Sequence, residues 1–170
     1  MKINEIQVFR PELISRHGES LAWCFTIFIG LSLGVILLRS GTIPPGAWAF
    51  LFLFFLIGLF ISLGNWVDRH TIISIALDGI TFSNGLRHTR LKWSDIQKVN
   101  VLSIRWGKLV QVIGVKSHFE FRTLSEVLYK GDVKGRVGFS NGFEILDQIL
   151  YASGLQLITK TGNEIYYSRL

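Results

Sequence analysis

The chain has 170 residues, of which 49% are hydrophobic and 18% are charged, and its formal net charge is +6 at pH 7. A chain of this length makes one domain, or a small domain with an appendage, which excludes elaborate multidomain machinery. Soluble domains usually contain about 25% charged residues, so the low charged fraction predicts that part of this chain lies outside water.

Two long apolar runs contain the hydrophobic excess. They cover residues 21–38 and 47–63, and neither contains Asp, Glu, Lys, Arg or His. As helices, each would span about 26 Å, close to the ~30 Å hydrocarbon core of a bilayer. Pro44 and Pro45, in the turn-like segment 39–46, favour the start of a second helix. We therefore expect a transmembrane hairpin over residues 21–66, and the absence of ionisable groups from both runs favours an anchor over a transporter.

The segment before the hairpin, residues 1–20, is polar, and no small-x-small site follows the first run. This pattern favours a retained helix over a cleaved signal peptide. Lys2, Arg10 and Arg16 precede the hairpin, only Arg39 lies in its loop, and residues 66–170 hold 14 basic groups against 9 acidic ones. The positive-inside rule then predicts an integral membrane protein with two helices and both termini in the cytoplasm. The basic surplus suits an anionic lipid surface, and we expect no nucleic-acid partner because no nucleic-acid-binding motif is present.

Small residues recur at four-residue spacing in both runs. Gly30 and Gly34 form a GxxxG step, and Gly58 and Ser62 form a related step in the second run. Such steps allow close approach of helices, either within the hairpin or between protomers, and they also occur without any special role. Tryptophans near the run ends are typical of anchors at the membrane interface: Trp23, Trp48 and Trp66.

After Trp66 the pattern changes to short alternating stretches separated by Gly and Asn. We expect strands over residues 71–77, 80–83, 87–93, 96–104, 108–115 and 117–122. Asp78-Gly79 and Asn84-Gly85 predict two of the turns between them, and Trp106-Gly107 predicts a break. Together these signals predict an antiparallel meander.

One expected strand, residues 87–93, has a basic outer face. The inward positions are Thr89, Leu91 and Trp93, and the outward positions are His88, Arg90 and Lys92. Three roles are open for the outward residues: a solvated face, contact with lipid headgroups, or contact with a protein partner. For Trp93 we expect a core position rather than a recognition role, and for Asp95 hydrogen bonds to nearby backbone amides that stabilise the turn.

The C-terminal part is expected to contain one helix. Residues 124–138, which include Gly131 and Gly138, predict a loop. Asn141 and Glu144 form a capping-box pattern that begins a helix, and Gly154 ends it. The expected apolar stripe of this helix is Phe143, Leu146, Ile149 and Leu150. Residues 155–159 and 164–169 predict a β-hairpin that extends the domain over residues 155–170.

Two motifs carry a resemblance to a known family. LDGITFSNG, residues 77–85, and TRLKWSDIQKV, residues 89–99, follow an apolar hairpin and precede a late helix, an order that resembles bacterial pleckstrin-homology-like (PH-like) membrane proteins, including the YcxB-like group. The resemblance covers residues 71–153 and depends on Asp78, Gly79, Ile80, Leu91, Trp93, Asp95, Ile96, Val99 and the helix over residues 143–150.

This resemblance implies an α+β membrane protein. A two-helix transmembrane hairpin would precede a mainly antiparallel-β PH-like domain, residues 67–154, with a C-terminal helix. The short Asp78-Gly79 turn has no counterpart of the basic cluster that holds phosphoinositides in other PH domains. The resemblance therefore implies the fold and does not carry over that ligand.

Motifs for catalysis, cofactors and metals are absent from the sequence. The single cysteine, Cys24, lies in the first apolar run, and no two histidines have the HxxxH spacing of a metal site. No G-x-S-x-G elbow or P-loop is present. We therefore expect a non-enzymatic, membrane-anchored module that binds or recruits a protein or lipid partner at the cytoplasmic face. The alternative is a structural or accessory subunit of a larger membrane complex, and a homo-oligomer is also compatible with the sequence.

Overall fold

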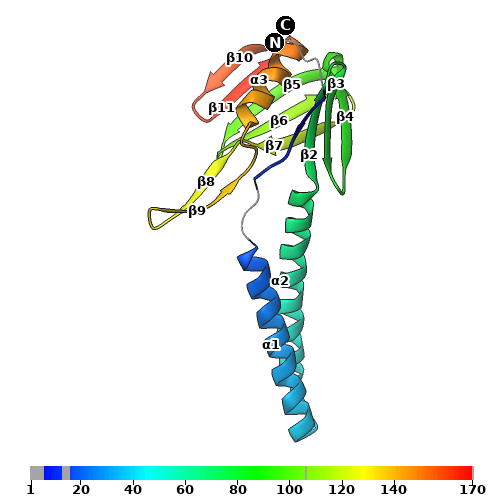
Figure 1. Cartoon of the computed structure of the whole chain (residues 1–170), viewed down its shortest axis with the longest axis vertical. Helices are drawn as coiled ribbons and strands as arrows, with labels where there is room; N and C mark the ends of the chain where they lie inside the picture. The colour runs from blue at the N-terminus through cyan, green and yellow to red at the C-terminus, as the bar shows by residue number, and fades with distance from the viewer. Residues whose placement is uncertain (1–5, 13–15, 106, 170) are drawn as a thin grey trace. The chain divides into compact units, whose positions relative to one another are not determined.

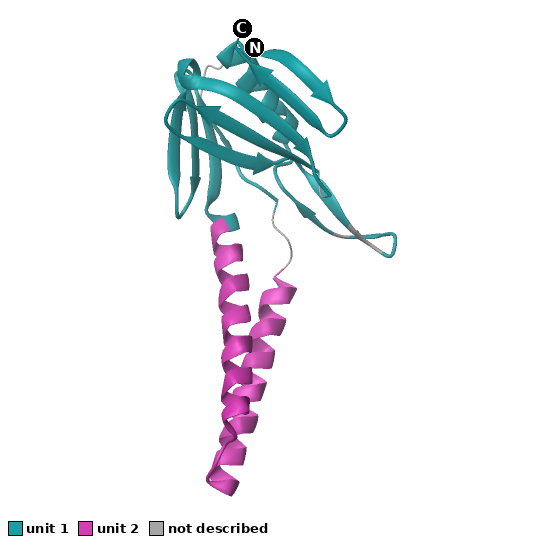
Figure 2. Cartoon of the chain, turned by 180° about the vertical axis from the view of Figure 1, so that it is seen from behind, with its two compact units in different colours: residues 1–14, 68–170 teal, residues 15–67 magenta. Residues whose placement is uncertain are grey.

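The computed structural model describes residues 6–12, 16–105 and 107–169, so Lys2 and Trp106 lie outside the described residues. The chain divides into two compact units, coloured separately in Figure 2. One unit, Ser15–Val67, is helical. The other combines Met1–Ile14 with Asp68–Leu170 and consists mainly of antiparallel strands with one long helix.

The helical unit is a hairpin of two helices, α1 (His17–Ser40) and α2 (Pro45–Arg69). Both are long and apolar enough to cross a membrane, as the two runs predict. Gly41 ends α1 in the left-handed conformation, with φ of 72°, and its N–H donates to the Leu37 carbonyl. Pro45 begins α2, where a missing N–H costs no hydrogen bond. The connecting loop is therefore shorter than the expected segment 39–46.

The β unit contains two large antiparallel sheets (Figure 1). The four-stranded sheet has the order β1 (Gln7–Phe9), β2 (Thr71–Ala76), β3 (Gly79–Asn84) and β4 (His88–Lys92). The five-stranded sheet has the order β10 (Gln156–Thr161), β11 (Glu164–Ser168), β5 (Ile96–Ser103), β6 (Lys108–Gly114) and β7 (His118–Arg122). The six expected strands correspond to β2–β7 and are confirmed, but they do not form one continuous meander, because β4 and β5 belong to different sheets.

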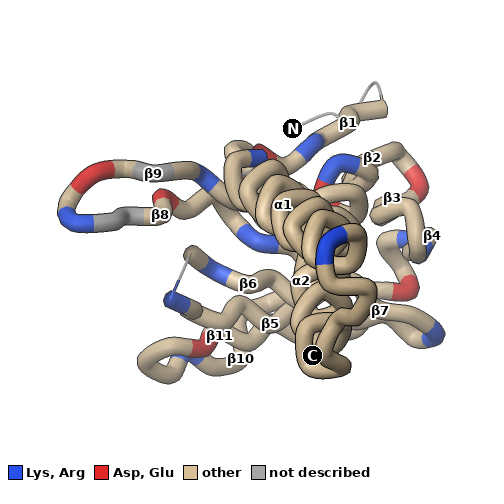
Figure 3. Tube along the Cα trace, turned by 90° about the horizontal axis from the view of Figure 1, so that it is seen from below, with Lys and Arg blue, Asp and Glu red and all other residues tan. Residues whose placement is uncertain are grey.

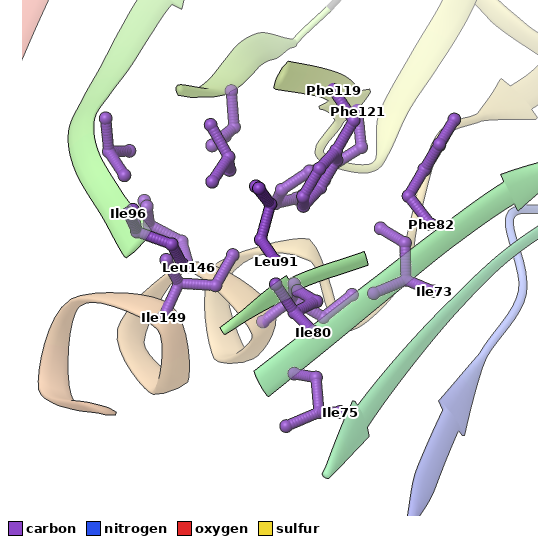
Figure 4. Packing of buried hydrophobic residues seen from close by; sticks show 14 of the residues in the cluster. Ile73, Ile75, Ile80, Phe82, Leu91, Ile96, Phe119, Phe121, Leu146 and Ile149 are labelled. Carbon is purple, nitrogen blue, oxygen red and sulfur yellow. The ribbon is translucent and has the colours of Figure 1, made fainter. Parts of the chain in front are cut away.

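The core lies between the sheets and the helix α3 (Gly142–Ser153). Alternate residues of the strands point inward, and Phe82 and Phe119 stack at 5.3 Å between ring centroids. In Figure 4, Leu146 and Ile149 of α3 point into the same cluster. Burial of this apolar surface is the main force that holds the unit together.

Segments near both ends of the described chain join the sheets. The segment before the hairpin belongs to the β unit rather than standing apart, and the expected C-terminal β-hairpin forms as β10 and β11 and adds to the five-stranded sheet. β1 pairs with β2, with Phe9 opposite Ile73, and the half-buried Phe9 packs against the core. β11 pairs with β5, with Tyr166 opposite Asn100. These pairings cover strand edges that the meander alone would leave open.

The first hairpin turn lies one residue earlier than expected. Ala76 pairs with Gly79, so the turn is Leu77-Asp78 rather than Asp78-Gly79. Gly79 is required for a different reason: a Cβ there would lie 2.1 Å from the Leu91 carbonyl oxygen of the neighbouring strand. The backbone of β4 therefore approaches at a distance that only glycine permits.

The expected strand over residues 87–93 ends early. β4 stops at Lys92, and Trp93–Asp95 form a short 3-10 helix, η1. A 3-10 turn does not follow the two-residue alternation of a strand. Trp93 therefore does not continue the row of inward-facing side chains to which Leu91 belongs.

The expected loop over residues 124–138 is instead a third, two-stranded sheet. It consists of β8 (Ser125–Tyr129) and β9 (Asp132–Val137). Lys130 and Gly131 between them have φ values of 52° and 87°, and positive φ at both central residues is what tight hairpin turns require.

Helix α3 begins and ends where the sequence predicts, but its details differ. The Asn141 side chain makes no hydrogen bond to the backbone of the first turn and instead donates to Glu144, at 2.9 Å. Ile145 is fully buried, whereas Phe143, expected in the apolar stripe, is 53% exposed. The buried face therefore keeps Leu146 and Ile149 of the expected stripe and includes Ile145 in place of Phe143.

Candidate functional site

The basic residues of β4 lie on one face, as expected. His88, Arg90 and Lys92 are exposed, and Thr89 and Leu91 between them are buried. β4 is an edge strand of its sheet, and β3 covers only one of its sides. We call His88, Arg90 and Lys92 the β4 stripe.

An acidic residue partly neutralises this stripe. Arg90 donates a hydrogen bond from Nη2 to Oδ2 of Asp78, and both side chains are more than half exposed. The hydrogen bond and the positive charge of Arg90 hold the pKa of Asp78 below its ordinary value, with a smaller contribution from Lys92. In Figure 3 the trace near β3 and β4 accordingly carries both basic and acidic positions.

The sheet face beside the stripe is polar and small. Arg90 lies opposite Thr81, which lies opposite Ser74, which in turn lies opposite Val8. Val8 is exposed, and the two hydroxyl residues are half-buried. Cations beside a row of hydroxyl groups can hydrogen-bond acidic or polar groups of a ligand that lies across the sheet.

Trp93 and Asp95 act at the end of β4. The half-buried Trp93 packs against the core, and its Nε1 donates to the carbonyl oxygens of Ala76 and Leu77, at 3.2 and 3.0 Å. These hydrogen bonds from Trp93 therefore stabilise the β2–β3 turn. The Asp95 carboxylate accepts a hydrogen bond from the Ser94 hydroxyl, at 3.1 Å, in place of the expected backbone amides.

A hollow that sequence reasoning missed lies beside η1. It has a volume of about 520 Å³ and opens to solvent, and the cations Lys98 and Arg169 line it together with Ser94, Gln97, Val115 and Ser168. Arg169 donates from Nη2 to the Trp93 carbonyl oxygen, at 2.9 Å. Two cations and two hydroxyl groups could hold a small anion. The sequence signal is weak because Lys98 and Ser168 become neighbours only through the pairing of β5 with β11.

The small residues of the hairpin have different surroundings. Trp23 lies against Gly58, where a Cβ would be 3.4 Å from the indole ring, and its Nε1 donates to Ser62. A Cβ on Gly30 would meet Leu51 at 3.8 Å, whereas beside Gly34 nothing lies within 4 Å. The contacts within the hairpin thus involve Gly30, Gly58 and Ser62.

A polar cluster lies near the open end of the hairpin. The Glu19 carboxylate accepts hydrogen bonds from the Ser62 hydroxyl, at 2.8 Å, and from the Asn65 amide, at 2.7 Å. Ser62 in turn accepts the Trp23 hydrogen bond, so Trp23 connects the two helices in addition to its expected interfacial position. These bonds join side chains of α1 and α2 and hold that end of the hairpin together.

Within the described residues, no three His, Cys, Asp or Glu side chains come together in a way that could hold a metal ion. No protein-family model matches the chain, and neither a curated protein nor a solved structure matches it.

Proposed function

We propose that this chain is a non-enzymatic binding module with a PH-like domain, anchored in a membrane by its helical hairpin. The hairpin supports the anchor, because in the most apolar windows of α1 and α2 only 11% and 6% of residues are buried. Soluble monomers rarely leave two long apolar helices so exposed. Two antiparallel sheets with a late helix support the PH-like assignment.

The β4 stripe carries the proposed binding role. Its cations lie on the exposed face of an edge strand, next to a polar sheet surface. An acidic lipid headgroup or an acidic protein segment is the type of partner that such a surface recognises. The excess of basic residues outside the hairpin loop supports a cytoplasmic position for both termini and for the stripe.

A charge reversal tests this role on the full chain. The chain is placed in nanodiscs of neutral or partly anionic lipid, and hydrogen exchange of the β4 amides is measured at low and moderate salt. A lipid partner predicts protection of β4 in anionic discs only, lost in salt and in the double variant Arg90→Glu, Lys92→Glu. A protein partner predicts that a defined protein co-purifies with the parent chain and is lost in the same variant.

The matched control makes the same charge change elsewhere, with Lys116→Glu and Lys160→Glu. This control should keep whichever interaction the parent shows. If neither lipid protection nor partner binding depends on Arg90 and Lys92, the binding role of the stripe is wrong.

One observation favours the alternative, an accessory subunit of a larger complex. All six residues of the edge strand β10 are exposed, and they include Leu157 and Ile158. An open edge with apolar side chains can pair with a strand of another chain. Sizing after extraction in mild detergent separates the two functions. A complex of fixed stoichiometry that persists in the double variant Arg90→Glu, Lys92→Glu favours the accessory subunit, and a monomer, a homo-oligomer or a complex lost in that variant favours the binding module.

A further inference from the structure

One end of the four-stranded sheet is tied to the end of α2. α2 ends at Arg69 and β2 begins at Thr71, so about 7 Å at most separates the two Cα atoms. Both residues belong to the same compact unit. If the hairpin spans a bilayer, β2 begins within two residues of the end of the helix that leaves that bilayer.

Strand register places another loop at the same end. Thr71 lies opposite Asn84, so the β3–β4 loop, residues 85–87, follows directly beside the start of β2. The Leu77-Asp78 turn lies at the opposite end of the same strands, where Gly79 pairs with Lys92.

The β3–β4 loop is held in a defined shape. The Asn84 side-chain oxygen accepts hydrogen bonds from the backbone N–H groups of Leu86 and Arg87, at 3.2 and 2.8 Å. The Asn84 N–H donates to the Arg87 carbonyl, and Gly85 adopts a positive φ of 80°. This arrangement leaves Leu86 exposed, with 68% of the residue's surface accessible to solvent.

The residues after Leu86 suit a lipid surface. Arg87 and His88 are both exposed. Arg87 donates one hydrogen bond from Nη2 to the His118 carbonyl, which leaves other N–H groups of the guanidinium for a phosphate. An apolar side chain beside a cation is the combination that membrane-surface segments use, since the first enters the acyl boundary and the second stays with the headgroups.

We propose that the β3–β4 loop inserts Leu86 into the interface of the bilayer that holds the hairpin, with Arg87 and His88 on acidic headgroups. The proposal rests on the proposed function, since it requires the hairpin to span that bilayer. It also divides the β4 stripe: His88 lies at the membrane end, and Lys92 lies about 13 Å further along the strand. Arg90 and Lys92 are then available to a partner other than the lipid that contacts the loop.

Spin labels on the full chain test the insertion. Cys24→Ala removes the chain's one cysteine, and single cysteines replace Leu86, Leu77 or Leu31 for nitroxide labelling in nanodiscs containing anionic lipid. Leu77 is the matched control, because it is an exposed leucine at the other end of the sheet, and Leu31 reports on α1. Collision of each label with oxygen indicates lipid, and collision with a nickel chelate indicates water.

The insertion predicts a lipid signature at Leu31 and Leu86 and a water signature at Leu77, with several-fold fewer nickel collisions at Leu86 than at Leu77. A lipid signature at Leu31 with a water signature at both Leu86 and Leu77 would overturn the insertion and leave the anchor intact. A water signature at Leu31 would overturn the anchor and, with it, the proposed function.

The contribution of Arg87 is tested in the Leu86-labelled chain. Arg87→Glu should raise nickel collisions at Leu86 in anionic discs, because it replaces attraction to headgroups by repulsion. Arg87→Lys keeps the charge and should leave the label in lipid. Equal nickel collision rates at Leu86 in the two variants would show that Arg87 does not contribute to the contact with the headgroups.

Discussion

Arg90 illustrates how a single neighbour changes the meaning of a charged residue. On the sequence alone it is one of three exposed basic residues, whereas in the fold its guanidinium is hydrogen-bonded to Asp78. The β2–β3 turn brings Asp78 to β4, and alternation within one strand cannot predict that contact. A ligand at Arg90 must therefore compete with, or share, this carboxylate.

The pair should be visible in the titration of Asp78. Arg90 holds the pKa of Asp78 below its ordinary value, so the pair contributes stability above that ordinary pKa and loses it as pH falls through the lowered value. Arg90→Ala should raise the pKa of Asp78 toward 3.8, measured by carboxyl NMR of the full chain in detergent micelles. Lys92→Ala should raise it less, and an equal rise in both variants would contradict the hydrogen bond as the main cause.

Trp93 stabilises the β2–β3 turn through packing and hydrogen bonds, and substitutions can separate the two. Trp93→Phe keeps much of the ring contact and removes the donor, so we expect a loss of about 1 kcal/mol in the free energy of unfolding. Trp93→Ala removes both and should cost about 2–4 kcal/mol for a half-buried aromatic residue. Hydrogen exchange of β2 and β3 amides with increasing denaturant measures both changes. Equal losses in the two variants would mean that the ring itself contributes little.

At the scale of elements, β1 makes the segment before the hairpin part of the β unit. Phe9 packs against the core, while Val8, one residue earlier, is 57% exposed on the other face of the sheet. Phe9→Ala should therefore lower the stability of the β unit by about 2 kcal/mol, and Val8→Ala should stay within about 0.5 kcal/mol. Denaturant unfolding of the full chain, followed by amide exchange in β2, compares the two variants. Similar effects would mean that β1 is not fixed in the observed register.

The sequence predicts those elements whose formation depends on adjacent residues. The apolar runs predicted both long helices, and alternation predicted β2–β7 with boundaries within one or two residues. In α3 the position of Gly154 was sufficient to predict the end of the helix, because a left-handed residue there needs glycine. Such signals reside in a few adjacent residues and need no tertiary contact.

Elements that depend on distant partners were missed or misplaced. β1 has three residues and no pattern of its own, and only the edge of β2 makes it a strand. The β8–β9 hairpin was missed because Lys130-Gly131 is a weaker turn signal than Asn-Gly, and its mixed charges hid the alternation. In α3, Ile145 rather than Phe143 is buried because the sheets above the helix decide which side it presents.

The same reason explains which parts of the candidate site were found. The exposed face of β4 follows from alternation within five residues, so its basic residues could be named in advance. The hollow beside η1 combines Ser94 and Lys98 with Ser168 and Arg169, which meet only because β11 pairs with β5. The sequence predicts Gly79 as a turn residue, whereas in the fold it lies in β3. The reason for a glycine there is the close approach of β4, which the sequence cannot show.

At the scale of the whole molecule, strand pairing constrains the ways in which the hairpin can cross a membrane. β1 precedes the hairpin, β2 follows it, and the two strands pair in one sheet. A folded sheet cannot have strands on opposite sides of a bilayer, so a hairpin that spans a bilayer must have both of its flanking segments on the same side. This constraint is independent of charge, whereas the proposed cytoplasmic position of these segments depends on the basic residues.

Cysteine labelling of intact cells tests both parts of this topology. In a Cys24→Ala background, Ser40→Cys at the loop end of α1 should react with a membrane-impermeant thiol reagent added outside. Leu77→Cys, in the exposed turn of the β unit, should react only after the membrane is permeabilised. The reverse pattern would retain two crossings but place the β unit outside. Reaction at both sites in intact cells would mean that the helices do not cross the membrane, because the two crossings place the loop and the β unit on opposite sides.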